Sequence, residues 1–182
     1  PARIFPWSTE LPKNRLGLAQ WLTDPKHPLT SRVIINRLWA QVFGAGLVAS
    51  SENLGMQGDL PTHPELLDTL SVDFIRSGWN TKAMLRRLVL SSTFRQASTP
   101  TAEAREKDPA NLLLARGPVL RLTAEMVRDQ ALLASGKLVE KVGGESVQES
   151  ANRRSVYTYR KRTAPPDNML IFDAGSREVC QP

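Results

Sequence analysis

The sequence is poor in the residues that build disulfide-linked and metal-held scaffolds. It contains one cysteine, Cys180, and two histidines, His27 and His63, among 182 residues. A single thiol excludes an internal disulfide framework and a zinc site with several thiolate ligands. The chain also has no CxxCH motif for the attachment of a c-type haem. We therefore expect no cofactor and no metal in this chain.

Long apolar runs and known reaction motifs are also missing. No run approaches the roughly 18 residues of a membrane span, and no charged start followed by an apolar stretch indicates a signal peptide. The motifs HExxH, GxSxG and GxGxxG and the Walker A motif do not occur. The chain begins at Pro1 instead of a methionine and stops without an obvious closing element. We expect residues 1–182 to form one incomplete domain of a longer protein.

Positive charge is concentrated in one segment of the chain. The formal net charge is +6, and five basic residues with no acid lie between residues 151 and 163, so the remainder is nearly neutral. Basic and aromatic side chains alternate over residues 153–162, as in a single-strand nucleic-acid binder or an edge strand protected by cations. Because this segment has only two tyrosines, we favour the edge strand, and nucleic acid is not an expected partner.

Apolar spacing and capping residues predict a mainly α fold, with five or six helices in an irregular bundle. Core helices are expected within residues 12–97, a linker or loose helix at 98–110, and a helix plus a β element within 111–182. The individual helices are predicted at residues 14–23, 30–43, 64–77, 81–89 and 123–135. Thr30 or Ser31 is the expected N-cap of the second helix, and Thr62 with Glu65 forms a predicted capping box at the start of the third.

Two non-helical features are predicted between and after these helices. Four glycines between residues 44 and 61 indicate a long Gly-containing ordered loop. The β-branched and aromatic residues around Val156 predict a strand of about seven residues, a minor β element near residues 154–161. A single strand needs a pairing partner, which must be a segment with a weak strand signal or lie beyond Pro182.

Polar residues at helical spacing give a candidate pocket. Arg32 and Asn36 are four apart on the flank of the second helix, and His63 starts the third. Three more, Glu125, Arg128 and Asp129, share a side of the last helix, and Arg154 belongs to the basic segment. If the fold brings them together, they could bind a carbohydrate or another anionic polymer. If each serves a helix cap or a salt bridge, they are scaffold, and that interpretation is favoured for each of them.

Several motifs in fixed order resemble one family. They are Asn36-Arg37-Leu38-Trp39, Phe43-Gly44-Ala45-Gly46-Leu47-Val48, Thr62-His63-Pro64-Glu65-Leu66-Leu67-Asp68, Ser77-Gly78-Trp79, Phe94-Arg95-Gln96, Arg128-Asp129, Arg153-Arg154-Ser155-Val156-Tyr157 and Phe172-Asp173. Together they resemble the planctomycete PSD-type domain of unknown function, number fifteen fifty-three of its naming series. The chain departs from the family at Ala40-Gln41, Leu85-Arg86 and Phe94, where members commonly carry Gln-His, Leu-His and Tyr.

The resemblance implies an architecture more than an activity. Members usually form the C-terminal part of large exported proteins with a cytochrome-c-like domain upstream. It implies an exported or periplasmic location, haem c only on an upstream domain, and neighbouring domains of the parent protein as partners. The leading hypothesis is a non-catalytic or uncharacterised structural and interaction module, and whether the chain is an enzyme stays open. An enzyme or binding domain for a carbohydrate or other anionic polymer is the alternative, and nucleic-acid binding through residues 153–162 is a weaker one.

Overall fold

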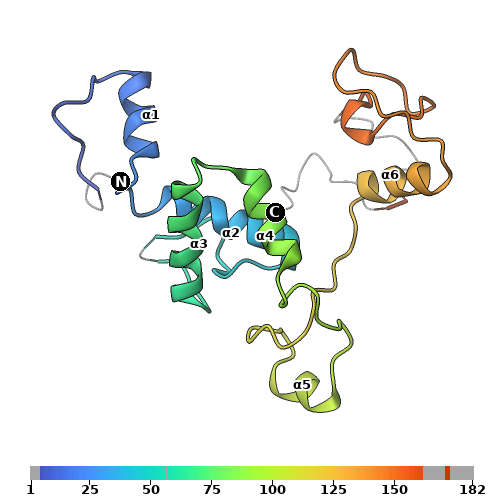
Figure 1. Ribbon diagram of the computed structural model, residues 1–182, viewed down its shortest axis with the longest axis horizontal. Helices are drawn as coiled ribbons and strands as arrows, with labels where there is room; N and C mark the ends of the chain where they lie inside the picture. Colours follow the sequence, from blue (N-terminus) through green and yellow to red (C-terminus); the bar gives the residue numbers. More distant parts are fainter. Residues whose placement is uncertain (1–4, 56, 162–170, 173–182) are drawn as a thin grey trace. The chain divides into compact units, whose positions relative to one another are not determined.

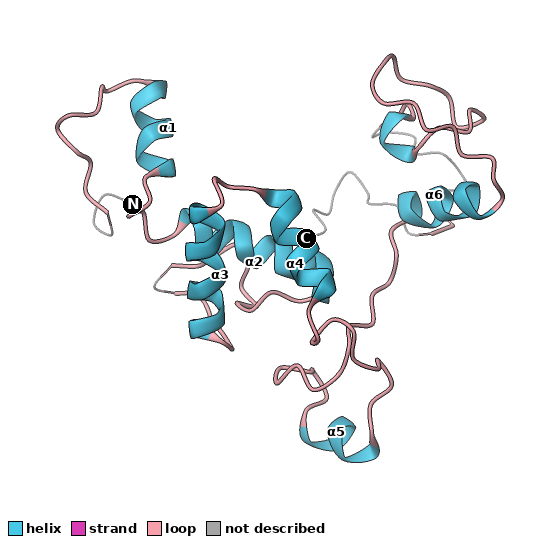
Figure 2. Ribbon diagram, in the orientation of Figure 1, coloured by secondary structure: helices cyan, strands magenta, loops and turns pink. Residues whose placement is uncertain are grey.

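The computed structural model describes residues 5–55, 57–161 and 171–172. The helices are α1 (Arg15–Thr23), α2 (Thr30–Phe43), α3 (Pro64–Arg76), α4 (Thr81–Leu90), α5 (Ala102–Lys107) and α6 (Ala124–Ala134), with a 3-10 turn η1 (Ser155–Tyr157). Figure 2 shows helices joined by loops, and the described residues form no sheet. The predicted mainly α fold is confirmed.

The chain divides into two units, which are described separately: unit 1 is Pro1–Leu120 and unit 2 is Arg121–Pro182. Helices α1 to α5 belong to unit 1, and α6 and η1 belong to unit 2. Within the segment expected as a linker or loose helix, α5 forms a single short helix capped by Thr101. That the two units are parts of one incomplete domain stays a prediction.

Unit 1 has a hydrophobic core built by α2, α3 and α4, and α2 packs against both of the other helices (Figure 1). The buried side chains follow the three-to-four residue spacing of an amphipathic helix. The core residues are Ile35, Trp39, Val42, Leu47, Val48, Leu67, Leu70, Phe74, Met84 and Leu88. Two of them, Leu47 and Val48, come from the loop after α2, so this loop is part of the core.

A buried amide fixes that glycine-containing loop. Asn36 is 0% exposed; its Nδ2 donates to the carbonyl of Val48 at 3.0 Å, and its Oδ1 accepts from the amide of Val48 at 2.9 Å. Gly44 ends α2 with φ +90°, a conformation that favours glycine. At Gly46 a Cβ would lie 2.6 Å from the Asn36 amide nitrogen, so only glycine lets the loop approach so closely.

The start of α3 differs from the predicted capping box. The residue preceding the helix is His63, and no side chain caps it. The hydroxyl of Thr62 instead donates to the carbonyl of Leu47 at 3.2 Å, and the Thr62 amide donates to the same oxygen at 2.8 Å. The predicted capping box is therefore wrong, because Thr62 bonds to Leu47 of the core loop and does not cap α3.

The minor β element of unit 2 consists of isolated bridges, Val139 with Arg153 and Val147 with Thr158. The seven-residue strand expected around Val156 is wrong, since Ser155–Tyr157 form the 3-10 turn η1. The amide and the hydroxyl of Ser155 both donate to Asp129 of α6, each at 2.7 Å. This contact bends the backbone toward α6 and interrupts the pairing on either side.

His27 takes the capping role that the sequence assigned to Thr30 or Ser31. Its Nδ1 accepts from the amides of Leu29 at 3.3 Å and Thr30 at 3.2 Å, at the start of α2. The ring is buried and lies edge-on to Trp21, with centroids 4.6 Å apart. An Nδ1 atom that accepts these bonds carries no proton, so the cap requires neutral imidazole.

We expect His27 to make unit 1 sensitive to acid. Burial lowers its pKa below the ordinary 6.5, and the negative charge of Asp24 offsets only part of this effect. The unfolded chain therefore binds the proton more readily than the folded chain. The contribution of His27 to the free energy of unfolding is largest above pH 6.5 and decreases as the pH falls below that value. Urea unfolding followed by tryptophan fluorescence will show a lower midpoint at pH 5.5 than at pH 7.5. His27→Gln will remove this difference and His63→Gln will keep it; an unchanged difference in His27→Gln contradicts the assignment.

Candidate functional site

The seven residues of the predicted pocket divide between the two units. Arg32, Asn36 and His63 belong to unit 1, whereas Glu125, Arg128, Asp129 and Arg154 belong to unit 2. Each group is therefore a separate cluster, built by its own part of the chain.

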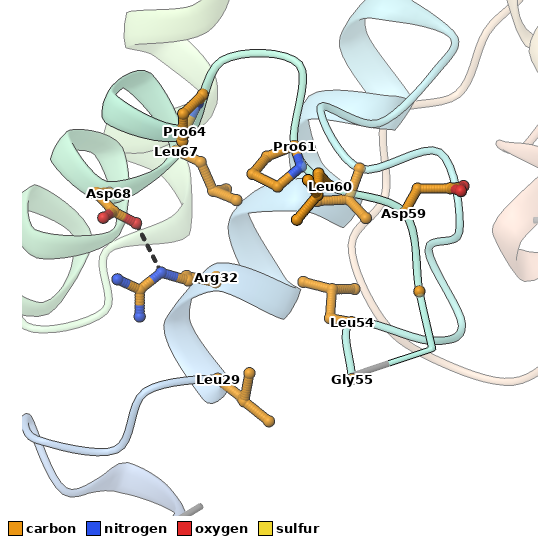
Figure 3. A pocket seen from close by; sticks show the side chains of 12 residues that line it. Leu29, Arg32, Leu54, Gly55, Asp59, Leu60, Pro61, Pro64, Leu67 and Asp68 are labelled. Atoms are coloured by element: carbon orange, nitrogen blue, oxygen red, sulfur yellow. Dashed lines mark hydrogen bonds and ion pairs between the residues drawn. The ribbon is translucent and has the colours of Figure 1, made fainter.

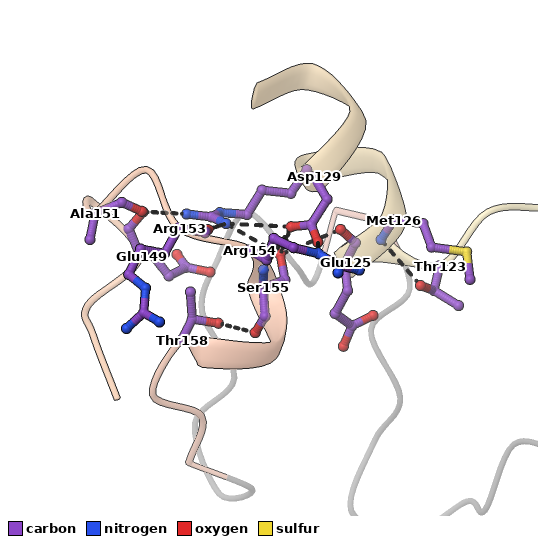
Figure 4. A network of polar contacts seen from close by, with 11 residues as sticks. Thr123, Glu125, Met126, Asp129, Glu149, Ala151, Arg153, Arg154, Ser155 and Thr158 are labelled. Atoms are coloured by element: carbon purple, nitrogen blue, oxygen red, sulfur yellow. Dashed lines mark hydrogen bonds and ion pairs between the residues drawn. The ribbon is translucent and has the colours of Figure 1, made fainter. Parts of the chain in front are cut away.

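The cluster in unit 2 is centred on Arg128 of α6. Figure 4 shows its neighbours Asp129, Arg154 and Ser155. The guanidinium of Arg128 donates to the carbonyl oxygens of Glu149 at 2.7 Å, Ala151 at 2.9 Å and Arg153 at 2.8 Å. It also donates to the hydroxyl of Ser155 at 3.3 Å, and the Arg128 side chain is only 13% exposed. Arg128 thus ties the loop before η1 to α6 and has its donors occupied by the fold.

Asp129 completes this attachment. Its carboxylate accepts both bonds from Ser155 and lies 3.7 Å from the guanidinium of Arg128 and 3.5 Å from that of Arg154. On the same helix Glu125 pairs with Arg160. A carboxylate between two cations and two donors serves as a structural acceptor, so the cluster holds the backbone together.

Arg153, expected in the basic segment, is also used by the fold. It is buried and donates to the carbonyls of Lys141 at 2.8 Å and Glu145 at 3.2 Å. Its guanidinium lies 4.1 Å from the centroid of the Tyr157 ring, a cation–π contact. This role could not be predicted from the sequence, because periodicity does not distinguish a buried arginine from an exposed one. The last basic residue of the segment, Arg162, lies outside the described residues.

Unit 2 is held by these polar contacts and has little apolar burial. Among its described residues the buried ones are Ala124, Arg153 and Ser155. Large apolar side chains remain outside, with Val142 93% exposed and Val156 74% exposed. Small units that lack a sufficient apolar core depend on other contacts for stability, and here arginine–carbonyl bonds supply them.

Replacing Arg128 will therefore destabilise unit 2. We expect Arg128→Ala to lower the free energy of unfolding of residues 141–158 by about 3 kcal/mol, because it leaves three backbone carbonyls without their donor and removes one of the two cations beside Asp129. The measurement is a urea titration that follows the nuclear magnetic resonance signals of these residues. Arg154→Ala is the control, since this arginine is 64% exposed and its pair is worth less than about 0.5 kcal/mol. Equal effects of the two substitutions would contradict the role of Arg128.

An open cavity of about 390 Å³ lies beside Arg32 in unit 1. Arg32 lines it and donates through Nε to Asp68 at 2.7 Å and through a second nitrogen to the carbonyl of Pro28. Figure 3 shows Arg32 and Asp68 facing the cavity from one side and the apolar side chains of Leu60 and Pro61 from the other.

Of the three predicted residues in unit 1, Arg32 alone is placed to meet a ligand in this cavity. Among the described residues that line it, neither Asn36 nor His63 occurs. Asn36 is committed to Val48, and the Nδ1 of His63 lies 3.0 Å from the hydroxyl of Thr62. The apolar residues Leu54, Leu60 and Pro61, which also line the cavity, were not predicted. They belong to the loop between α2 and α3, which has no helical periodicity to indicate their position.

Within the described ranges, no group of three or more histidine, cysteine, aspartate or glutamate side chains could hold a metal ion. No helix in this part of the chain is long and apolar enough to cross a membrane. Cys180 lies outside the described residues.

The structure defines a mainly α chain of two units, in which the polar cluster of unit 2 holds loops onto a helix. The sequence model of PSD1, a protein of unknown function (DUF1553), matches residues 14–182, and the chain belongs to this family. Neither a curated protein nor a solved structure matches the chain.

Proposed function

We propose that this domain is a structural and interaction module of a large, exported, haem-containing planctomycete protein and that it binds the neighbouring domains of that parent. The observation that carries the proposal is the uncovered apolar surface of unit 2. We call it the unit 2 apolar surface, and its residues are Leu133, Val139, Val142 and Val156.

In the described part of unit 2, more large apolar side chains are exposed than are buried. Each of the four side chains of the unit 2 apolar surface is more than half exposed, whereas the buried apolar residue of the described part of unit 2 is Ala124. Contacts between the domains of one chain cover exposed apolar groups of this kind. At the same time Arg128 and Asp129 are occupied by the backbone, which favours a scaffold over a polar site.

The remaining parts of the proposal rest on membership of the family. Haem c belongs on an upstream cytochrome-c-like domain, with no cofactor assigned to this chain, and the location is exported or periplasmic. The proposal assigns no reaction to the chain.

Cross-linking of the parent protein tests the contact directly. We expect cross-links from Lys137 and Lys141, which are close in sequence to Val139 and Val142, to an upstream domain. The double substitution Val142→Asp with Val156→Asp will weaken these cross-links while the unfolding free energy of the isolated chain changes by less than about 0.5 kcal/mol, as expected for exposed positions. Leu113→Asp is the control, because this residue is 74% exposed but lies in unit 1. Cross-links that persist unchanged in the double variant would refute the proposed surface.

A second candidate function is binding of a carbohydrate or another anionic polymer, and the cavity beside Arg32 favours it. The cavity combines a charged pair with apolar side chains, as ligand sites commonly do. Nucleic-acid binding through residues 153–162 has no comparable support, since Arg153 is buried.

The second candidate is tested with tetragalacturonate as the ligand, by titration calorimetry. If the cavity binds it, Arg32→Ala will weaken binding about tenfold, in line with the loss of one charge-assisted hydrogen bond, and His63→Ala will leave it unchanged. Wild-type affinity in Arg32→Ala removes the cavity as the site.

A further inference from the structure

We infer that the N-terminal side of α1 binds acidic oligosaccharides in a depression lined by Trp7, Lys13, Asn14, Arg15 and Leu18. The depression has a volume of about 530 Å³. None of these residues belongs to the unit 2 apolar surface, so this inference does not depend on the proposed interaction with neighbouring domains. It has the same class of ligand as the cavity beside Arg32 but uses different residues.

Trp7 provides a fixed aromatic wall. One face of its ring stacks on Trp21, with centroids 6.2 Å apart and planes at 25°. Its indole N–H donates to the carbonyl of Leu11 at 3.4 Å, and the residue stays partly exposed beside the depression. An aromatic ring that is already held in place loses little conformational entropy when a ligand packs on its open face.

The turn that leads into α1 is equally well fixed. The side chain of Asn14 caps the helix by accepting from the amide of Gly17 at 3.1 Å, and the Asn14 amide donates to the carbonyl of Pro12 at 2.8 Å. A Cβ on Gly17 would lie 1.9 Å from that carbonyl oxygen, so glycine is required for the turn to lie against the helix. This geometry places Lys13 and Arg15 on either side of Asn14.

The two cations give the depression its charge. Lys13 and Arg15 are exposed, and no carboxylate in the described part of the chain lies within ion-pair distance of either. Arg32, by contrast, is already paired with Asp68. The depression therefore carries positive charge next to the apolar surfaces of Trp7 and Leu18.

This combination matches a sugar ring that carries a carboxylate or sulfate group. The apolar face of a pyranose can pack on the indole, its acidic group can pair with Lys13 or Arg15, and a hydroxyl can accept from the NH2 group of Asn14. Single-strand nucleic-acid sites use a row of aromatic platforms along a basic groove. One tryptophan beside two cations fits an acidic saccharide better, and nucleic acid becomes an outcome of the test.

The test is calorimetric titration of the whole chain with tetragalacturonate, with the neutral cellotetraose and a ten-nucleotide thymidylate strand as comparisons. We expect tetragalacturonate to bind, more weakly as salt is added, and cellotetraose to bind at least about tenfold more weakly. Trp7→Ala will weaken binding about tenfold or more. The double substitution Lys13→Glu with Arg15→Glu will also weaken binding about tenfold or more. Because it leaves the stack of Trp7 on Trp21 intact, it tests the site even if Trp7→Ala does not fold.

The matched control is Lys82→Glu with Arg86→Glu on α4, which changes the net charge equally at exposed positions. It will leave the affinity within about twofold, the effect expected of distant charges. Equal loss in both double variants, or tighter binding of the thymidylate strand, overturns the inference. Binding that is lost in Arg32→Ala but kept in the Trp7 and Lys13/Arg15 variants also overturns it and leaves the second candidate standing. No binding of tetragalacturonate at all overturns both and leaves the interaction module untouched.

Discussion

The bonds from Arg128 to the carbonyl oxygens of residues 149, 151 and 153 are the constraint on which unit 2 depends. One planar guanidinium holds three points of a loop, a geometry that a lysine ammonium on its flexible stem does not reproduce. The neighbouring Asp129 then fixes the Ser155 backbone, and Arg153 holds the preceding loop in the same way. Unit 1 is organised differently, since α2, α3 and α4 enclose an apolar core.

This difference bears on function. In unit 2 Arg128 and Arg153 face inward to the backbone, whereas large apolar side chains such as Val142 and Val156 are exposed. That arrangement is unusual for a unit that acts alone and is natural for one covered by a neighbour. The arginines that most resemble a ligand site are thus structural, and the groups that remain available are the apolar surface of unit 2 and the two depressions of unit 1.

Much of the fold could be predicted from the sequence, because helix spacing and caps are local. Helices α1 and α6 lie within the ranges predicted for them, 14–23 and 123–135, and the buried Asn36 holds the glycine-containing loop. The capping box and the strand were wrongly predicted because hydrogen bonds to residues distant in sequence replace the local ones. Thr62 donates to the carbonyl of Leu47, and Ser155 donates to Asp129. For the candidate site, helical spacing predicts that Glu125, Arg128 and Asp129 share one side of a helix, but it does not reveal that Arg128 bonds to backbone carbonyls. The role of Trp7 was likewise hidden, since it depends on a stack with Trp21.

The contacts of Arg128 and Arg153 hold unit 2, and we propose that a neighbouring domain covers its apolar surface. Both statements are tested by hydrogen exchange of the backbone amides of residues 137–159, compared between this chain alone and the whole parent protein. We expect measurable protection in the isolated chain at amides such as Val147 and Tyr159, which bond to backbone carbonyls, and a clear rise in protection within the parent. Identical exchange in both would contradict the covering domain, and complete lack of protection in the isolated chain would contradict the arginine-held unit.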